Sequence, residues 1–233
     1  MHKGYRINES MINENNLIND NFNTQKIHEE LNILDYVQPN NGKIEIDGTE
    51  LMKKWFPLQS DKKIFVSHSH GDFNVVKKFA GYLDNQGIKA FIDAAVWGDN
   101  DRLIDTINRT YNKLPGEQNT FYYSEDHVIT SNIDMLLIRA LNRMINYCDV
   151  FIFIESENST QDGSTYSPWI MEELELQNIL AHIQSNKRVE KRTIFHDDIN
   201  VTFSHDIQQN LKELTPIKNL EDFEIVLNSI QEA

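Results

Sequence analysis

From Lys62 onward, short apolar runs alternate with longer segments of helical periodicity, and this alternation constrains the fold more than any other feature of the chain. Residues 150–154 are all β-branched or aromatic, as in a strand that is buried on both faces of a parallel sheet. Shorter runs predict four more strands, at residues 64–66, 88–93, 192–195 and 214–217. We therefore expect an α/β fold of three layers, in which helices cover both faces of a central parallel sheet of about five strands, as in flavodoxin-like folds.

Apolar residues at helical spacing predict the covering helices. The first of these helices has an apolar face from Val75 to Leu83 and ends at Gly87. Further stripes predict helices at residues 101–112, 133–145, 168–183 and 222–230. Residues 114–130 are polar with scattered aromatic side chains, which predicts a loop.

The first 60 residues have weaker patterns. Residues 1–24 are rich in Asn, which predicts a flexible or weakly structured segment. We expect residues 1–60 to form a partly flexible N-terminal extension with short helices, and residues 61–233 to form the α/β domain. Within the extension, the patterns predict a helical segment at Ile27, Leu31 and Leu34, a turn at residues 39–42, a strand at 43–46 and a helix at 51–56.

Composition and charge exclude several classes of partner. The formal net charge of −14 repels the phosphates of nucleic acids and of anionic lipid surfaces. No apolar run approaches the roughly 20 residues that span a bilayer, and residues 1–20 lack the apolar core of a signal peptide. The single cysteine, Cys148, excludes an internal disulfide and adjoins an apolar run, which favours a core residue over a nucleophile. We expect a cytoplasmic protein.

Three stretches of the chain together carry a resemblance to a known family: residues 64–72 (IFVSHSHGD), 87–93 (GIKAFID) and 167–174 (SPWIMEEL). They resemble the Toll/interleukin-1 receptor (TIR) domain family. The first resembles its opening strand and the Ser-rich turn after it, the second resembles its second strand, and the third is similar to the S-x-W-x-x-x-E-L start of a helix in the family. Between the second and the third, residues 148–154 (CDVFIFI) stand in the place of its central strand. The resemblance covers about residues 62–233.

This resemblance implies an enzyme that cleaves the nicotinamide–ribose bond of NAD, with Glu173 as the catalytic residue. Residues 96–130 are longer than the corresponding part of a typical member, as in a group of bacterial TIR-like proteins that have an enlarged insertion there. Members of the Thoeris type act in antiviral defence by depleting NAD or by making an ADP-ribose-derived signal for a receptor protein. Family members also associate through TIR–TIR contacts, often without catalysis, so a non-catalytic adaptor is the alternative. A nucleoside deoxyribosyltransferase, which also uses a glutamate on ribose, is a third possibility.

The chemistry of the reaction explains why a glutamate is needed at this helix start. Nicotinamide leaves as a neutral group, and positive charge develops on the ribose, where a fixed carboxylate stabilises it. Ser167 is placed to cap the helix, and Trp169 and Glu173 are stacked at positions i and i+4. Glu172 also lies near Trp169 on the helical wheel, and only the family spacing favours Glu173.

The remaining candidate substrate-binding residues are Ser67, His68, Ser69, Asp93, Trp97 and Trp169. The first three follow the first strand, where turn residues contact phosphate or ribose. Asp93 ends the second strand and either contacts the substrate or caps the loop. Trp97 either stacks on a base or packs beneath the insertion, and Trp169 lies beside the carboxylate. Because no cluster with metal-ligand spacing accompanies His68, we expect no metal and no cofactor, with NAD as the substrate.

Overall fold

The computed structural model describes residues 3–22, 36–40, 43–97, 100–185 and 204–232. The chain forms two compact units. The first comprises Met1–Asn23, Ser60–Ile92 and Met144–Ala233, and the second comprises Thr24–Gln59 and Asp93–Arg143. Among the described helices, none is long and apolar enough to cross a membrane.

A five-stranded parallel sheet forms the centre of the first unit. Its strands lie in the order β5-β4-β6-β1-β9 and every neighbouring pair is parallel. The bounds are β1 Lys3–Asn8, β4 Ile64–Ser67, β5 Ala90–Phe91, β6 Val150–Glu155 and β9 Thr215–Ile217. The predicted strands at 64–66, 150–154 and 214–217 are confirmed, and so is the α/β class with a central parallel sheet of five strands.

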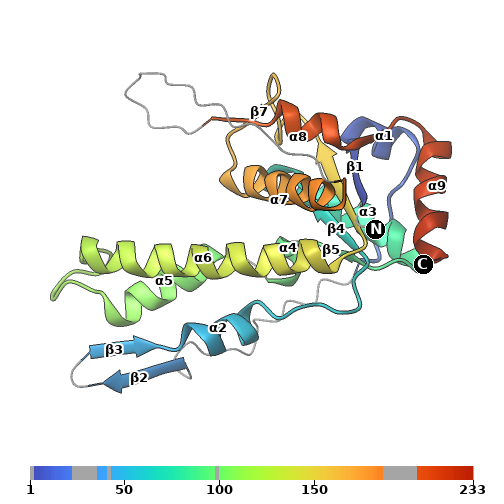
Figure 1. Cartoon of the computed structure of the whole chain (residues 1–233). Helices are drawn as coiled ribbons and strands as arrows, with labels where there is room; N and C mark the ends of the chain where they lie inside the picture. The colour runs from blue at the N-terminus through green and yellow to red at the C-terminus, as the bar shows by residue number, and fades with distance from the viewer. Residues whose placement is uncertain (1–2, 23–35, 41–42, 98–99, 186–203, 233) are drawn as a thin grey trace. The chain divides into compact units, whose positions relative to one another are not determined.

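Helices cover both faces of this sheet (Figure 1). On one face lie α7 (Pro168–Ser185) and α8 (Gln208–Glu213), and on the other lie α3 (Phe73–Asn85) and α9 (Leu220–Gln231). Under α7, the rings of Phe91, Phe65 and Phe151 form a row across three strands, with centroid separations of 5.5 and 5.7 Å. On the opposite face, Phe79 of α3 contacts Phe223 of α9 at 5.6 Å. The first unit therefore has three layers, as in flavodoxin-like folds.

The N-terminal segment corrects the expected division of the chain. Strand β1 lies between β6 and β9, with Lys3 opposite Val150 and Asn8 opposite Glu155. A short helix, α1 (Glu9–Glu14), follows it and buries Met11 and Ile12. The expectation of a flexible or weakly structured segment is wrong for residues 3–22, and these residues are not a peripheral extension. Numbered along the chain, the strand order is 3-2-4-1-5, whereas flavodoxin has 2-1-3-4-5, so the N-terminal strand occupies the place of the fourth.

A glycine allows α7 to approach β1 closely. A Cβ atom at Gly4 would lie 2.4 Å from Nε2 of Gln177 and 2.7 Å from Cδ2 of Leu214. Both of these side chains are buried and have little room to move aside. Gly4 is therefore required for the packing of α7 on the sheet.

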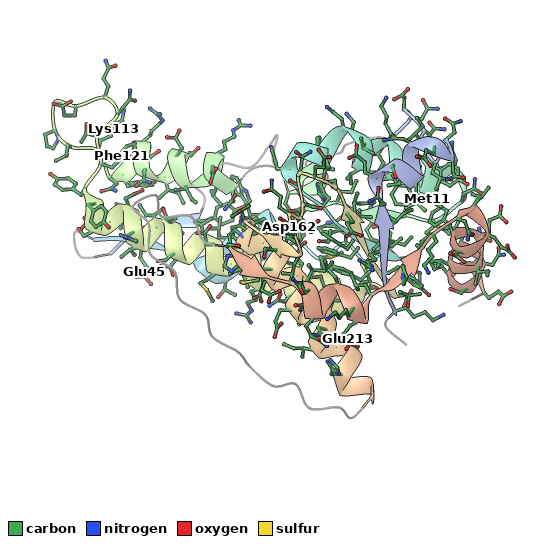
Figure 2. The ribbon with its side chains drawn as sticks, turned by 90° about the horizontal axis from the view of Figure 1, so that it is seen from above. Met11, Glu45, Lys113, Phe121, Asp162 and Glu213 are labelled. Atoms are coloured by element: carbon green, nitrogen blue, oxygen red, sulfur yellow. The ribbon has the colours of Figure 1, made fainter. Side chains whose placement is uncertain are left out.

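The second unit is built from a hairpin and helices. Strands β2 (Val37–Asn40) and β3 (Lys43–Ile46) pair antiparallel, and the predicted strand at residues 43–46 is confirmed as β3. The helices are α2 (Gly48–Trp55), α4 (Asp93–Val96), α5 (Asn100–Tyr111) and α6 (Tyr123–Tyr147), of which the last turn of α6 belongs to the first unit. A bridge between Lys113 and Phe121 closes the loop from α5 to α6 (Figure 2).

Several predicted boundaries are wrong. The loop expected at residues 114–130 ends early, because α6 begins at Tyr123 with Glu125 and Asp126 in its first turn, where acidic residues favour a helix. The strand expected at residues 88–93 is limited to β5, because Asp93 begins α4 and its carbonyl accepts from the N–H of Trp97 at 2.7 Å. The segment at Ile27, Leu31 and Leu34 and the strand at residues 192–195 lie outside the described residues.

The other elements of the first unit complete the carboxyl edge of the sheet. A 3-10 helix, η3 (His70–Asp72), leads from β4 into α3. Strands β7 (Ser164–Thr165) and β8 (His205–Asp206) pair antiparallel before α7 and α8 respectively. Helix α3 ends at Asn85, and Gly87 follows as the predicted glycine at its C-terminus, with a φ of +76°. The N–H groups of Gly87 and Ile88 donate to the carbonyls of Asp84 and Leu83.

Candidate active site

The carboxyl ends of β4 and β6 form the switch point of the sheet. From β4 the chain continues to β5 on one side, while β6 pairs with the other side of β4. Ligands of open α/β sheets bind outside the strand ends at such a point. Ser67 ends β4 opposite Phe153, and Glu155 ends β6, so a ligand site is expected at these two strand ends.

Helix α7 brings Glu173 to this edge. The N–H of Ile170 bonds Oγ of Ser167 at 3.3 Å, so Ser167 caps the helix as predicted. Glu173 is 4% exposed, and its Oε2 accepts a hydrogen bond from Oγ of Ser67 at 2.6 Å. Glu172 is more exposed, at intermediate burial. Of the two adjacent glutamates, Glu173 is the one that faces the sheet.

Burial of Glu173 is unusual for a helix that covers a sheet. Gln177, one turn further along α7, is also buried, so a polar row faces the strands where apolar residues are usual. A carboxylate costs free energy to bury unless hydrogen bonds compensate, and the Ser67 hydroxyl supplies one of them. Packing alone therefore does not explain why a glutamate is buried at position 173.

Asp72 connects the turn after β4 to the loop after β6. It is 3% exposed, and its carboxylate accepts from Oγ of Ser156 at 2.5 Å and from Nδ2 of Asn158 at 2.6 Å. Asp72 occupies the N-cap position of α3, but its side chain makes no capping bond there. Its role is to join two segments of the carboxyl edge.

We expect Asp72→Ala to lower the free energy of unfolding by about 2–4 kcal/mol, because hydrogen bonds to a charged group contribute about 1.5–3 kcal/mol and the donors stay partly buried. Urea unfolding followed by circular dichroism measures the loss. Asp84→Ala is the matched control, because Asp84 is exposed on the same helix. Equal stability of the two variants would show that Asp72 does not hold the edge together.

The other residues predicted after β4 also lie at this edge. His68 is half-buried, with Nδ1 3.3 Å from the carbonyl oxygen of Val66 and its ring stacked on Phe73. Ser69 caps η3 by accepting from the N–H of Gly71 at 3.4 Å. Trp169 lies in the first turn of α7 and is half-buried. The structure thus brings Ser67 and Glu173 into direct contact and places His68, Ser69 and Trp169 on the same two segments.

Asp93 and Trp97 belong to the second unit. Trp97 is 2% exposed, packs edge-on against Phe56 at 5.5 Å, and donates its indole N–H to the carbonyl of Pro57 at 3.4 Å. Trp97 is therefore a core residue of that unit, as expected if it packs and does not stack on a base. Stacking on a base would require an exposed ring. Asp93 stands at the start of α4 and does not end β5.

Two polar cavities lie at the carboxyl ends of β1, β6 and β9. The larger, about 580 Å³, is lined among others by Asn8, Ser156 and Asn158. The smaller, about 350 Å³, is lined among others by Arg6 and Lys218. Glu173 lines neither cavity. Because Ser156 and Asn158 bond Asp72, the larger cavity adjoins the turn that follows Ser67.

Sequence reasoning missed the residues that β1 contributes here. Nη1 of Arg6 lies 3.4 Å from Oε2 of Glu155 on the neighbouring strand, and Nε of Arg6 is buried without a hydrogen-bond partner among the described residues. Asn8 follows at the end of β1 and lines both cavities. The only signal for them is a set of polar side chains at a strand end, which is visible only once residues 3–8 are recognised as a strand.

The structure limits the other chemistry open to the first unit. Cys148 is buried, and this burial, followed by the charge of Asp149, raises the pKa of its thiol to about 12, which disfavours the reactive thiolate. Within the described ranges, no three His, Cys, Asp or Glu side chains are grouped as a metal ion would require.

Comparison of the chain with protein-family models, with curated proteins and with solved structures finds no match. A function therefore has to be inferred from the side chains at the carboxyl edge.

Proposed function

We propose that the chain is a TIR-type enzyme that cleaves the nicotinamide–ribose bond of NAD, with Glu173 as the catalytic residue. The observation that supports this most is the buried carboxylate of Glu173, held by Ser67 at the carboxyl end of a central strand. The reaction would deplete NAD or produce an ADP-ribose-derived signal for a receptor protein in antiviral defence.

Glu173 would act by electrostatics and by orientation. As nicotinamide leaves, the ribose becomes oxocarbenium-like, and a preorganised carboxylate in surroundings of low dielectric stabilises that charge. The 2.6 Å hydrogen bond from Ser67 orients the carboxylate. The polar cavity beyond Asp72 is lined by Asn8, Ser156 and Asn158 but also by three glutamates, so it would accept an uncharged polar part of the dinucleotide and not its phosphates.

Catalysis by Glu173 would require the site to open. Glu173 is only 4% exposed, so a substrate would not reach its carboxylate in this state. We propose that self-association of the chain, or the binding of a partner, provides this opening, as TIR–TIR contacts do in the family that the chain resembles.

We expect the specific rate of nicotinamide release to rise with protein concentration. The measurement is liquid chromatography with mass spectrometry on full-length protein and NAD across a wide dilution series, which also identifies the product as linear, cyclic or conjugated. Nucleosides incubated in parallel test the deoxyribosyltransferase alternative. A constant specific rate would contradict activation by assembly, and cleavage of nucleosides without cleavage of NAD would contradict the proposed substrate.

The alternative is a non-catalytic adaptor that acts by TIR–TIR assembly. One observation favours it: Glu173 contacts Ser67 and lines neither of the two edge cavities, as a purely structural pair would. Under this alternative, concentrated protein releases no nicotinamide at any dilution.

A further inference from the structure

The second unit contains an apolar cavity of about 750 Å³. It is lined by the segment from β3 to α2 and by one face each of α5 and α6, and it is open to solvent on one side. Most of its lining is aliphatic, including Ile46, Ile107, Val128, Ile129, Ile133 and Leu136. A cavity of this size and lining fits a small molecule, for which a few placed polar groups fix the orientation.

A buried asparagine, Asn112, indicates that this cavity binds a ligand. It lines the cavity, is 2% exposed, and its Oδ1 has no hydrogen-bond partner among the described residues. Its Nδ2 donates to Oδ1 of Asn108 at 2.8 Å and to the carbonyl of Tyr122 at 3.0 Å. A flipped amide would set its oxygen against both of these acceptors, so the orientation is determined.

A chain of hydrogen bonds strengthens this acceptor. Asn108 donates its own Nδ2 to Oδ1 of Asp126 at 2.5 Å while its Oδ1 accepts from Asn112. A carboxylate at one end of such a chain polarises the amides that follow it. Oδ1 of Asn112 is therefore a strong acceptor whose burial without a donor costs free energy, and a ligand N–H or O–H would recover that cost.

The charge of the lining restricts the ligand further. Glu125 is the one charged residue among the lining side chains, and no Lys, Arg or His lines this cavity. Together with the net charge of −14, this excludes phosphorylated or other anionic ligands. The cavity therefore does not fit NAD, and Ser67 and Glu173 belong to the other unit.

We propose that the second unit binds a neutral, largely apolar small molecule that donates one hydrogen bond to Oδ1 of Asn112. The cavity supplies the apolar contact, and the buried amide selects for a donor. This site is independent of the NAD-cleaving function proposed for the first unit.

The test uses N-phenyl-1-naphthylamine, a neutral fluorophore with one N–H whose emission rises in apolar surroundings. Full-length protein should bind it saturably, at one molecule per chain. Its N-methyl derivative lacks the donor and should bind about tenfold more weakly, since one net hydrogen bond is lost. Asn112→Ala should remove this difference between the two probes. Equal affinity of the wild-type protein for both probes would overturn the proposal, even if Asn112→Ala fails to fold.

Two substitutions on the same face of α6 provide the matched pair. Val128→Glu places a charge in the lining at an exposed position and should weaken both probes by at least about tenfold. Met135→Glu is equally exposed but lies outside the lining, and it should leave binding unchanged. Unchanged binding of the probes to Val128→Glu would also overturn the proposal. So would a loss of binding as the protein concentration rises, because that would show that a second copy of the chain covers the cavity.

Discussion

Deletion of residues 1–8 is expected to abolish the cooperative unfolding transition of the first unit. Strand β1 pairs with β6 along its whole length and with β9 through Tyr5, Arg6 and Ile7. Its removal leaves two facing strand edges without partners in the middle of the sheet, and a buried unpaired backbone group costs about as much as a lost hydrogen bond. The deletion also removes Ile7, which is buried on the face opposite α7.

The expected loss is comparable to the whole stability of a domain, on the order of 5–15 kcal/mol. Circular dichroism and urea unfolding of the deletion variant measure it, with Lys3→Ala as the control because Lys3 is exposed on the same strand. A deletion variant that unfolds at the same urea concentration as the full chain would show that β1 is peripheral, as the sequence had suggested.

The apolar strands and the amphipathic helices could be predicted because each carries its own signal. Residues 150–154 are apolar on both faces, and β6 is buried on both. Helix α7 begins at Pro168 with Ser167 as its cap, as its sequence indicates. These elements depend on local patterning, which is visible in a single sequence.

Strand β1 could not be predicted, because its pattern is unlike that of a central parallel strand. Such strands are usually unbroken runs of apolar residues. In β1, by contrast, Gly4, Arg6 and Asn8 lie on the face toward α7. Gly4 lies under Gln177, and Arg6 pairs with Glu155. The partners that make a polar strand stable here come from elements about 150 residues away, and no local pattern reveals them.

The same limit applies to the candidate site. The sequence predicted Ser67 at a strand end and Glu173 near a helix start, but the contact between them joins residues 106 positions apart. Trp97 was expected at the same edge because it follows the second strand, yet it belongs to the second unit, where it is buried against Phe56. Nothing in the local sequence shows that the chain passes from one unit to the other at this point.

Glu173→Gln is expected to reduce the rate of NAD cleavage by at least about 100- to 1000-fold, as loss of one preorganised electrostatic group does in other enzymes. Glutamine has the same shape, and its carbonyl oxygen still accepts from the Ser67 hydroxyl at this buried position. The fold should therefore be retained while the negative charge near the ribose is lost. An unchanged unfolding temperature confirms that a loss of rate is chemical.

Glu172→Gln is the matched control, because it removes the same charge from the adjacent, less buried position on α7. The two variants have the same composition and net charge, so any general effect of charge on assembly is common to both. Only the position of the carboxylate relative to Ser67 differs.

The most direct measurement is the initial rate of nicotinamide release from NAD by the wild-type chain, Glu173→Gln and Glu172→Gln, each at the highest soluble protein concentration. A catalytic role for Glu173 predicts release by the wild-type chain and by Glu172→Gln at similar rates, with release by Glu173→Gln reduced at least about 100-fold. Release by Glu173→Gln at the wild-type rate would contradict it, and so would the absence of release by all three proteins.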